Sequence, residues 1–298
     1  MSKISHHHGG LGYIVLYGTA STEHVTYRQA LECMERHGLA GDFLNPPSLK
    51  SAFSRSINEM EKLMPAKFAR EVRETGEKKV MAIIREEHET NTEQFDFEVE
   101  TIAELDKTRK SVLAHGPDKG LVEKRFLHYS QNVIGDDLRQ MARKVVESLG
   151  GLSLRGSVNV RDAGGINFVP RKHAKQLEAL SNVLEELEIG YLKAFGVMRG
   201  TVEQESIFAT SAGYIKKEMM AVSEAVTKLT TRVSSAQQYK KRLERLKDLL
   251  LEYAALSEML KAAGPLLTRL DAAIALVEEK IVELTAERAS RRRAPSSP

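Results

Sequence analysis

Once the apolar positions of this 298-residue chain are assigned to packing, several lysine, arginine and asparagine side chains remain on polar faces. These side chains could contact another molecule. Packing does not account for these side chains. Lysine, arginine and asparagine are groups that contact the phosphates and base edges of nucleic acids. The sequence therefore predicts a set of nucleic-acid-binding residues: Lys50, Arg55, Asn159, Arg161 and Asn167.

A second chemistry is suggested by three carboxylates, Asp96, Glu98 and Glu100, which alternate along one predicted strand with Phe95, Phe97 and Val99. We expect the apolar residues to point inward and the acids outward. Three carboxylates on one strand face could hold Mg²⁺ for phosphodiester hydrolysis. The plainer interpretation is a solvated strand face, so a metal-dependent nuclease is the least favoured alternative.

The histidines and the single cysteine indicate no reaction. Cys33 lies between Leu31 and Met34 in a helical pattern, which is typical of a core position. His6–His8 is a flexible tract that cannot fix a metal geometry, and His128 and His173 have no partner at a spacing that suggests proton relay. The sequence thus predicts no catalytic residue, no metal ligand and no cofactor, and it favours a protein that is not an enzyme.

Composition sets the broad class. With 42% hydrophobic residues the chain can bury a core, and a net charge of +3 produces only a weak long-range field. No run approaches the roughly 20 apolar residues of a membrane span, and the first ten residues lack the apolar part of a signal peptide. We therefore expect a cytoplasmic protein with no membrane partner.

The N-terminal two-thirds predict an α+β fold. Residues 1–12 are expected to be disordered, and residues 13–133 to form a domain with a strand at 13–17, a helix pair at 26–37 and 48–64, and an antiparallel meander. The meander strands are predicted at 79–85, 95–99 and 111–115. A helix pair with a Ser/Lys/Arg face is compatible with a helix-turn-helix, and equally with any pair of surface helices.

Residues 134–200 predict a winged-helix-like module. A helix from Asp136 ends at Gly150-Gly151, a hairpin follows to Phe168, a leucine-striped helix comes next, and residues 191–198 form a last strand. We expect the hairpin to bury one face and expose the other. The buried residues would be Val158, Val160, Ile166 and Phe168, and the exposed ones Asn159, Arg161 and Asn167.

Residues 201–289 carry the 3-4 apolar spacing of an antiparallel coiled-coil or three-helix domain. Gly264-Pro265 is expected to break the helix, so that Leu270, Ile274, Val277 and Ile281 pack against the helix that contains Leu243, Leu246 and Leu250. Whether residues 201–263 form one helix or two stays open. Residues 290–298, which include Arg291–Arg293, predict a disordered basic tail.

Three stretches together resemble a family of uncharacterised proteins from phages and prokaryotic mobile elements: Ala52-Phe53-Ser54-Arg55, Ile83 to Glu86, and Leu154-Arg155 with Gly164 to Pro170. The resemblance covers about residues 13–200. It implies an origin in a phage or mobile element, and it implies no activity.

These observations favour a non-catalytic nucleic-acid-binding or assembly protein. Coiled-coil seams beside a compact domain typically serve self-association or binding to a partner protein. The alternative is a purely structural or protein-interaction subunit that uses its coiled coil. The sequence does not distinguish DNA from RNA, and it does not give the oligomeric state.

Overall fold

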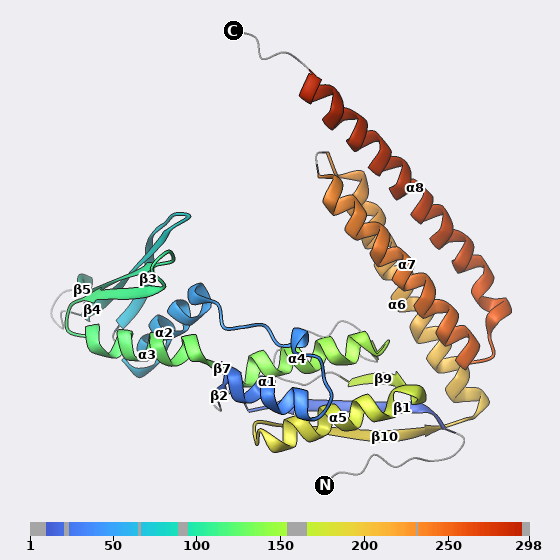
Figure 1. The fold of residues 1–298 in the computed structure, drawn as a ribbon, viewed down its shortest axis with the longest axis horizontal. Helices are drawn as coiled ribbons and strands as arrows, with labels where there is room; N and C mark the ends of the chain where they lie inside the picture. The colour runs from blue at the N-terminus through green and yellow to red at the C-terminus, as the bar shows by residue number, and fades with distance from the viewer. Residues whose placement is uncertain are drawn as a thin grey trace.

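Three antiparallel sheets are present in the computed structural model, which describes residues 10–20, 24–64, 67–88, 95–153, 166–230 and 232–293. Over these residues the chain is a mixed α+β protein with eight α-helices. Figure 1 shows a helix-covered sheet as the body, a second sheet with its own helices at one side, and an arm of long helices that leads to the C-terminus.

The body is built on a four-stranded sheet of order β10-β1-β9-β8. Its strands are β1 (Gly10–Thr19), β8 (Leu152–Ser153), β9 (Ile166–Pro170) and β10 (Gly190–Met198). Helices α1 (Tyr27–Arg36), α4 (Gly135–Ser148) and α5 (Ala174–Glu186) share one core with β1. A two-stranded ribbon, β2 (His24–Thr26) with β7 (Asn132–Ile134), and the 3₁₀ turns η1 (Gly41–Phe43) and η2 (Arg171–His173) complete this part.

The body sheet joins segments that the sequence analysis placed in two domains. β1 pairs antiparallel with both β9 and β10, although about 150 residues or more separate them in the sequence. One hydrophobic core accordingly includes Tyr13 and Val15 together with Val145 and Leu180. The expected boundary between residues 133 and 134 does not coincide with a boundary between cores, because strand pairing is not limited to neighbours in the sequence.

Residues 49–131 form the second sheet and its helices, with a core of their own. The elements are α2 (Leu49–Leu63), β3 (Lys67–Glu74), β4 (Lys78–His88), β5 (Phe95–Asp106), β6 (Ser111–His115) and α3 (Lys119–Gln131). The strand order is β3-β4-β5-β6, and both helices pack on the same side through residues such as Phe53, Ile57 and Phe126. The predicted meander is confirmed as antiparallel, and β3 is an additional strand that the sequence analysis did not predict.

The predicted inward face of β5 is wrong at its first half. Phe97 and Val99 are 61% and 53% exposed, whereas Ala103 and Leu105 are buried. The cause is a β-bulge: Ile83 pairs with Thr101 but Ile84 pairs with Val99, so Glu100 is an extra residue in the strand. A bulge reverses the alternation of side chains beyond it, and here it turns Phe97 and Val99 to the side without helices.

The arm consists of α6 (Thr201–Thr227), α7 (Val233–Leu256) and α8 (Leu260–Arg293), so residues 201–263 form more than one helix. As predicted, Leu270 and Val277 are buried in one core with Leu243, Leu246 and Leu250, and Ile274 and Ile281 pack against it. Among the described helices, none has the length and apolar character needed to cross a membrane.

Two expectations about the arm are wrong. Gly264-Pro265 does not break the helix, because the chain already reverses at Ser257 to Met259, where Glu258 has a positive φ of 58°. Pro265 lies early in α8, where its missing N–H removes a single intrahelical hydrogen bond. In addition, α8 continues to Arg293, so Arg291–Arg293 are helical and do not belong to a disordered tail.

The base of the arm is anchored to the body sheet. Leu11, Leu152 and Phe168 of the body form one buried cluster with Ile207 and Tyr253 of the arm. The Tyr253 hydroxyl lies 2.8 Å from the carbonyl oxygen of Gly150 and 3.3 Å from that of Phe168. The arm is therefore attached both by apolar packing and by a buried hydrogen bond.

Candidate nucleic-acid interface

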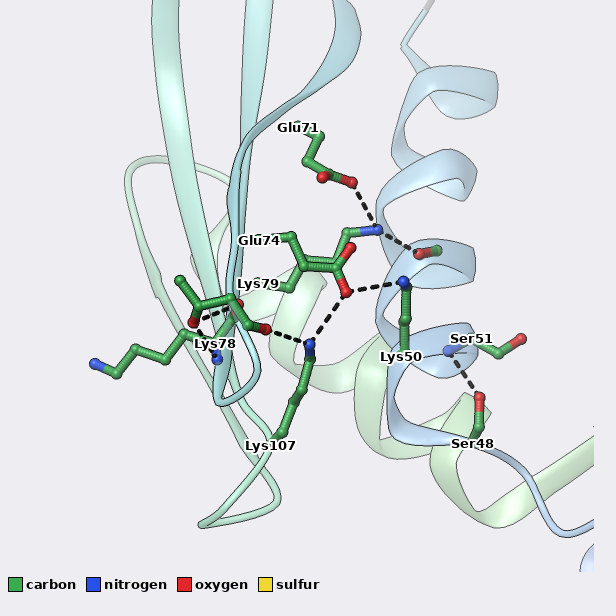
Figure 2. Close-up of polar contacts among 10 residues, drawn as sticks. Ser48, Lys50, Ser51, Glu71, Glu74, Lys78, Lys79 and Lys107 are labelled. Carbon is green, nitrogen blue, oxygen red and sulfur yellow. Dashed lines mark hydrogen bonds and ion pairs between the residues drawn. The ribbon is translucent and has the colours of Figure 1, made fainter. Parts of the chain in front are cut away.

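Lys50, in the first turn of α2, belongs to a network of ion pairs with the second sheet (Figure 2). Its Nζ lies 2.8 Å from Oε1 of Glu74, which also lies 3.1 Å from Nζ of Lys107. Hydrogen bonds from Lys50 and then Lys107 lower the pKa of Glu74 to about 2. Lys50 is thus on the surface, with 56% of its side chain exposed, but its charge is already compensated.

Beside this network, Lys79 bridges the sheet and α2 in the same view. Its Nζ lies 3.2 Å from Oε2 of Glu71 and 3.3 Å from the hydroxyl of Ser54. The side chain is 8% exposed. Lys50 of α2 and Lys79 of β4 therefore hold the helix on the sheet, which is a structural role.

Arg55 makes a structural contact within the fold. This differs from the expectation that its side chain has no role in packing and is available to bind another molecule. Its guanidinium donates two hydrogen bonds of 2.8 Å to the two carboxylate oxygens of Asp137 in α4. Asp137 also accepts a hydrogen bond from the backbone N–H of Ile134 at 3.1 Å. Both side chains of the pair are about three-quarters buried. The pair joins the residue 49–131 part to the body.

The remaining predicted contacts are not brought together with these. Asn159 and Arg161 lie outside the described residues, as does the hairpin turn that would form the wing. Asn167 is 9% exposed, so its expected position on a polar surface is wrong. It lies opposite Val15, whose side chain is in the helix-covered core, and it is hydrogen-bonded to the hydroxyl of Tyr17.

The carboxylates of β5 do not form an open metal site in the described residues. Glu100 is 6% exposed at its side chain; its Oε2 lies 2.5 Å from Nζ of Lys67, and its Oε1 is ion-paired with Arg85. Lys67 also lies 3.0 Å from Oδ2 of Asp118. These cations occupy the carboxylate oxygens that a metal would need, and the side chain of Asp96 lies outside the described part of the chain.

The feature that sequence reasoning missed is the face of the second sheet that α2 and α3 leave uncovered, which we name the open face. Two phenylalanine rings, Phe68 of β3 and Phe97 of β5, meet edge to face with 5.8 Å between their centroids. Other large apolar side chains lie exposed on the same sheet: Val72, Val99, Ile102 and Leu113. An exposed apolar patch of this kind is typical of a binding surface.

Two arginines of β3 lie on the same side of the sheet as the aromatic pair. The guanidinium of Arg70 lies 5.6 Å from the centroid of the Phe68 ring. Arg73 pairs in register with Val80 on the same side of the sheet. Both arginines are exposed, and within the described residues neither has a carboxylate at ion-pair distance. The spacing of Phe68 and Arg70, two residues apart, was the sequence signal that could have revealed this face, whereas Arg73 joins them only through the β-bulge between Glu71 and Arg73.

Comparison with known proteins gives a single finding. No curated protein and no solved structure matches the chain. A family of unknown function, DUF6744, matches residues 10–290, which include the body, the second sheet and the arm. Because the match covers nearly the whole chain, the protein belongs to the DUF6744 family.

Proposed function

We propose that the protein binds single-stranded nucleic acid on the open face of its β3–β6 sheet and catalyses no reaction on it. The observation that carries the proposal is the contact of Phe68 and Phe97 on an uncovered sheet, beside Arg70 and with Arg73 further along the same strand. No described carboxylate lies at ion-pair distance from either arginine. Unstacked bases bind by stacking on aromatic rings, and the phosphates of the backbone between them bind to cations. The open face offers both within one sheet.

Stacking supplies most of the expected affinity. A base stacked on an aromatic side chain contributes about 1–3 kcal/mol, and the sheet-based modules that bind single strands use exposed aromatic residues in this way. Arg70 and Arg73 add phosphate contacts or stack on bases themselves. With a net charge of only +3, a mode based on stacking suits this chain better than one based on its overall field.

Binding of a duplex through a helix and a wing has less support. In that mode Lys50, Asn159 and Arg161 would contact phosphates. Lys50 is paired with Glu74, and a competing phosphate must replace that carboxylate. The winged-helix assignment and the roles of Asn159 and Arg161 remain part of this alternative.

The second candidate function is that of an assembly subunit. The open face also carries exposed apolar side chains that a partner protein could cover, namely Val99, Ile102 and Leu113. Self-association through a coiled coil of the arm, a cytoplasmic location and an origin in a phage or mobile element belong to the same proposal. They are supported by the 3-4 apolar spacing, the composition and the resemblance noted above.

The test measures fluorescence anisotropy of labelled oligo(dT), oligo(U) and a mixed-sequence duplex with the full chain over a range of salt. The parent protein should prefer the single strands. Phe97→Ala should weaken binding about tenfold or more, since one stacked base is lost. The control is Phe195→Ala, a similarly exposed phenylalanine on β10 of the body sheet, which should leave the affinity unchanged.

Salt dependence gives a separate readout of the cations. The double variant of Arg70 and Arg73 to Ala should lower the slope of log affinity against log salt by roughly 1–2 units, because about 0.7 of a counterion is released per single-strand phosphate. Absence of binding by the parent at low salt would refute the proposal and favour the assembly subunit. Equal effects of Phe97→Ala and Phe195→Ala would refute the assignment to the open face.

A further inference from the structure

A separate cluster of chemically active side chains lies in the body, where α1 packs against α5. Cys33 and His37 are four residues apart at the end of α1, so they lie on one helical face. Glu186 is the last residue of α5. The sulfur of Cys33, a ring nitrogen of His37 and a carboxylate oxygen of Glu186 all lie within 4.8 Å of one another.

We propose that Cys33, His37 and Glu186 form a zinc-binding site that joins α1 to α5. Thiolate, imidazole and carboxylate are the three ligand types of protein zinc sites, and three protein ligands with a fourth position for water is a common arrangement. The sulfur ligand selects a borderline or soft ion and disfavours Mg²⁺ and Ca²⁺, which prefer oxygen ligands.

The geometry needs only a small adjustment to hold the ion. In a tetrahedral site, bond lengths near 2.0–2.3 Å place the ligand atoms roughly 3.3–3.8 Å apart. The ligand atoms of His37 and Glu186, now 2.8 Å apart, therefore have to separate slightly, and no pair of the three atoms has to close by more than about 1–1.5 Å. His37 and Glu186 lie at helix ends, with 23% and 37% of their side chains exposed, and they can make this movement. Cys33 is buried and supplies the fixed ligand.

Contacts that already exist would orient the carboxylate. Oε2 of Glu186 lies 2.8 Å from Nε2 of His37, while Oε1 is ion-paired with Arg36. Zinc would take the place of the hydrogen bond between His37 and Glu186 and leave Arg36 on the other oxygen. A hydrogen-bonded partner on the far side of a ligand is the usual second contact in such sites. On binding, the sulfur–zinc bond forms and the thiol proton is released to solvent.

The experiment titrates the metal-stripped full chain with Co²⁺, a spectroscopic substitute for zinc, and then displaces it with Zn²⁺. The parent should bind one equivalent at this site and show a thiolate-to-cobalt charge-transfer band. Cys33 is the single cysteine of the chain, so this band can report on no other site. In particular, replacing His6, His7 and His8 by alanine should leave the band in place.

Variants of the other two ligands decide the assignment. His37→Gln and Glu186→Gln should each weaken Co²⁺ and Zn²⁺ binding at least about tenfold. The matched control is His115→Gln, an exposed histidine on β6, which should bind like the parent. Zn²⁺ should also raise the melting temperature of the parent and not that of Cys33→Ser.

Two results would overturn the site. One is a parent protein without the thiolate band at saturating Co²⁺, which would assign any bound metal to the histidine tract. The other is a His37→Gln and a Glu186→Gln variant that both keep the parent affinity. If Cys33→Ser does not fold, the decision rests on these two variants, whose side chains lie nearer the surface.

Discussion

Lys50 and Arg55 lie five residues apart on α2 and look alike in the sequence, but their surroundings differ. Lys50 makes one ion pair at the surface with Glu74, and exposed pairs of this kind contribute little to stability because water and salt screen them. Arg55 makes a bidentate pair with Asp137 that is largely withdrawn from water. Removing the arginine of such a pair leaves the Asp137 carboxylate buried with fewer hydrogen bonds.

We predict that Arg55→Ala lowers the free energy of unfolding by about 2 kcal/mol, whereas Lys50→Ala leaves it almost unchanged. Chemical denaturation followed by circular dichroism measures both values. A double-mutant cycle with Asp137→Asn separates the pair from other effects of each substitution. Equal small effects of the two single variants would show that the Arg55–Asp137 pair does not stabilise the protein.

At the scale of elements, the bulge at Glu100 and the start of α3 form one locked unit. The hydroxyl of Thr101 accepts a hydrogen bond from the N–H of Asp118 at 3.2 Å and donates one to its carboxylate at 3.3 Å. Gly116, which connects β6 to α3, has a φ of 123°. A Cβ at this position would lie 2.1 Å from the carbonyl oxygen of Glu100. The chain passes so close to the bulge that only glycine fits.

We expect Gly116→Ala to destabilise the protein by about 2 kcal/mol or more, because it adds a clash to a backbone conformation that other residues avoid. The matched control is Gly120→Ala in α3, where a Cβ meets nothing within 4 Å. That change should be neutral or stabilising by up to about 1 kcal/mol, since alanine favours the helix. Thermal unfolding of the two variants gives the comparison. A Gly116→Ala variant as stable as the parent would contradict the close approach.

At the scale of the whole molecule, Tyr253 connects the arm to the body. It is fully buried, its ring packs near that of Phe168, and its hydroxyl bonds to the Gly150 carbonyl. Burial is the main cause that raises the pKa of this hydroxyl, which stays protonated as a donor. Because Gly150 and Phe168 belong to separate segments of the body, this one side chain fixes the arm against both.

Tyr253→Phe should cost about 1–2 kcal/mol, because it keeps the ring but leaves a buried carbonyl with one donor fewer. Hydrogen exchange should become faster at the arm base, around the start of α6 and the end of α7, while the body core keeps its protection. Tyr214→Phe in α6, where the side chain is partly exposed, is the control and should change little. Uniform loss of protection over the whole chain would show that the junction is not a local anchor.

The sequence by itself determined the elements that depend on local chemistry. The 3-4 spacing of Leu243, Leu246 and Leu250 predicted a packed helix, and Thr26 and Gly38 marked the limits of α1, where Thr26 caps the backbone N–H of Gln29 and Gly38 has a φ of 74°. Alternation of apolar and polar residues predicted the β4–β6 meander. Each of these signals operates within a few residues of the chain.

Only the tertiary structure decided which distant segments meet. Residues far apart in the sequence come together where β1 pairs with β9 and β10, and where Glu186 approaches Cys33 and His37. The exposure of Phe97 to solvent depends on one bulge. An alternating pattern has a period of two, so a single extra residue such as Glu100 reverses every prediction beyond it. Both the open face and the Cys33–His37–Glu186 cluster follow from pairings of this kind, which is why the sequence alone did not predict them.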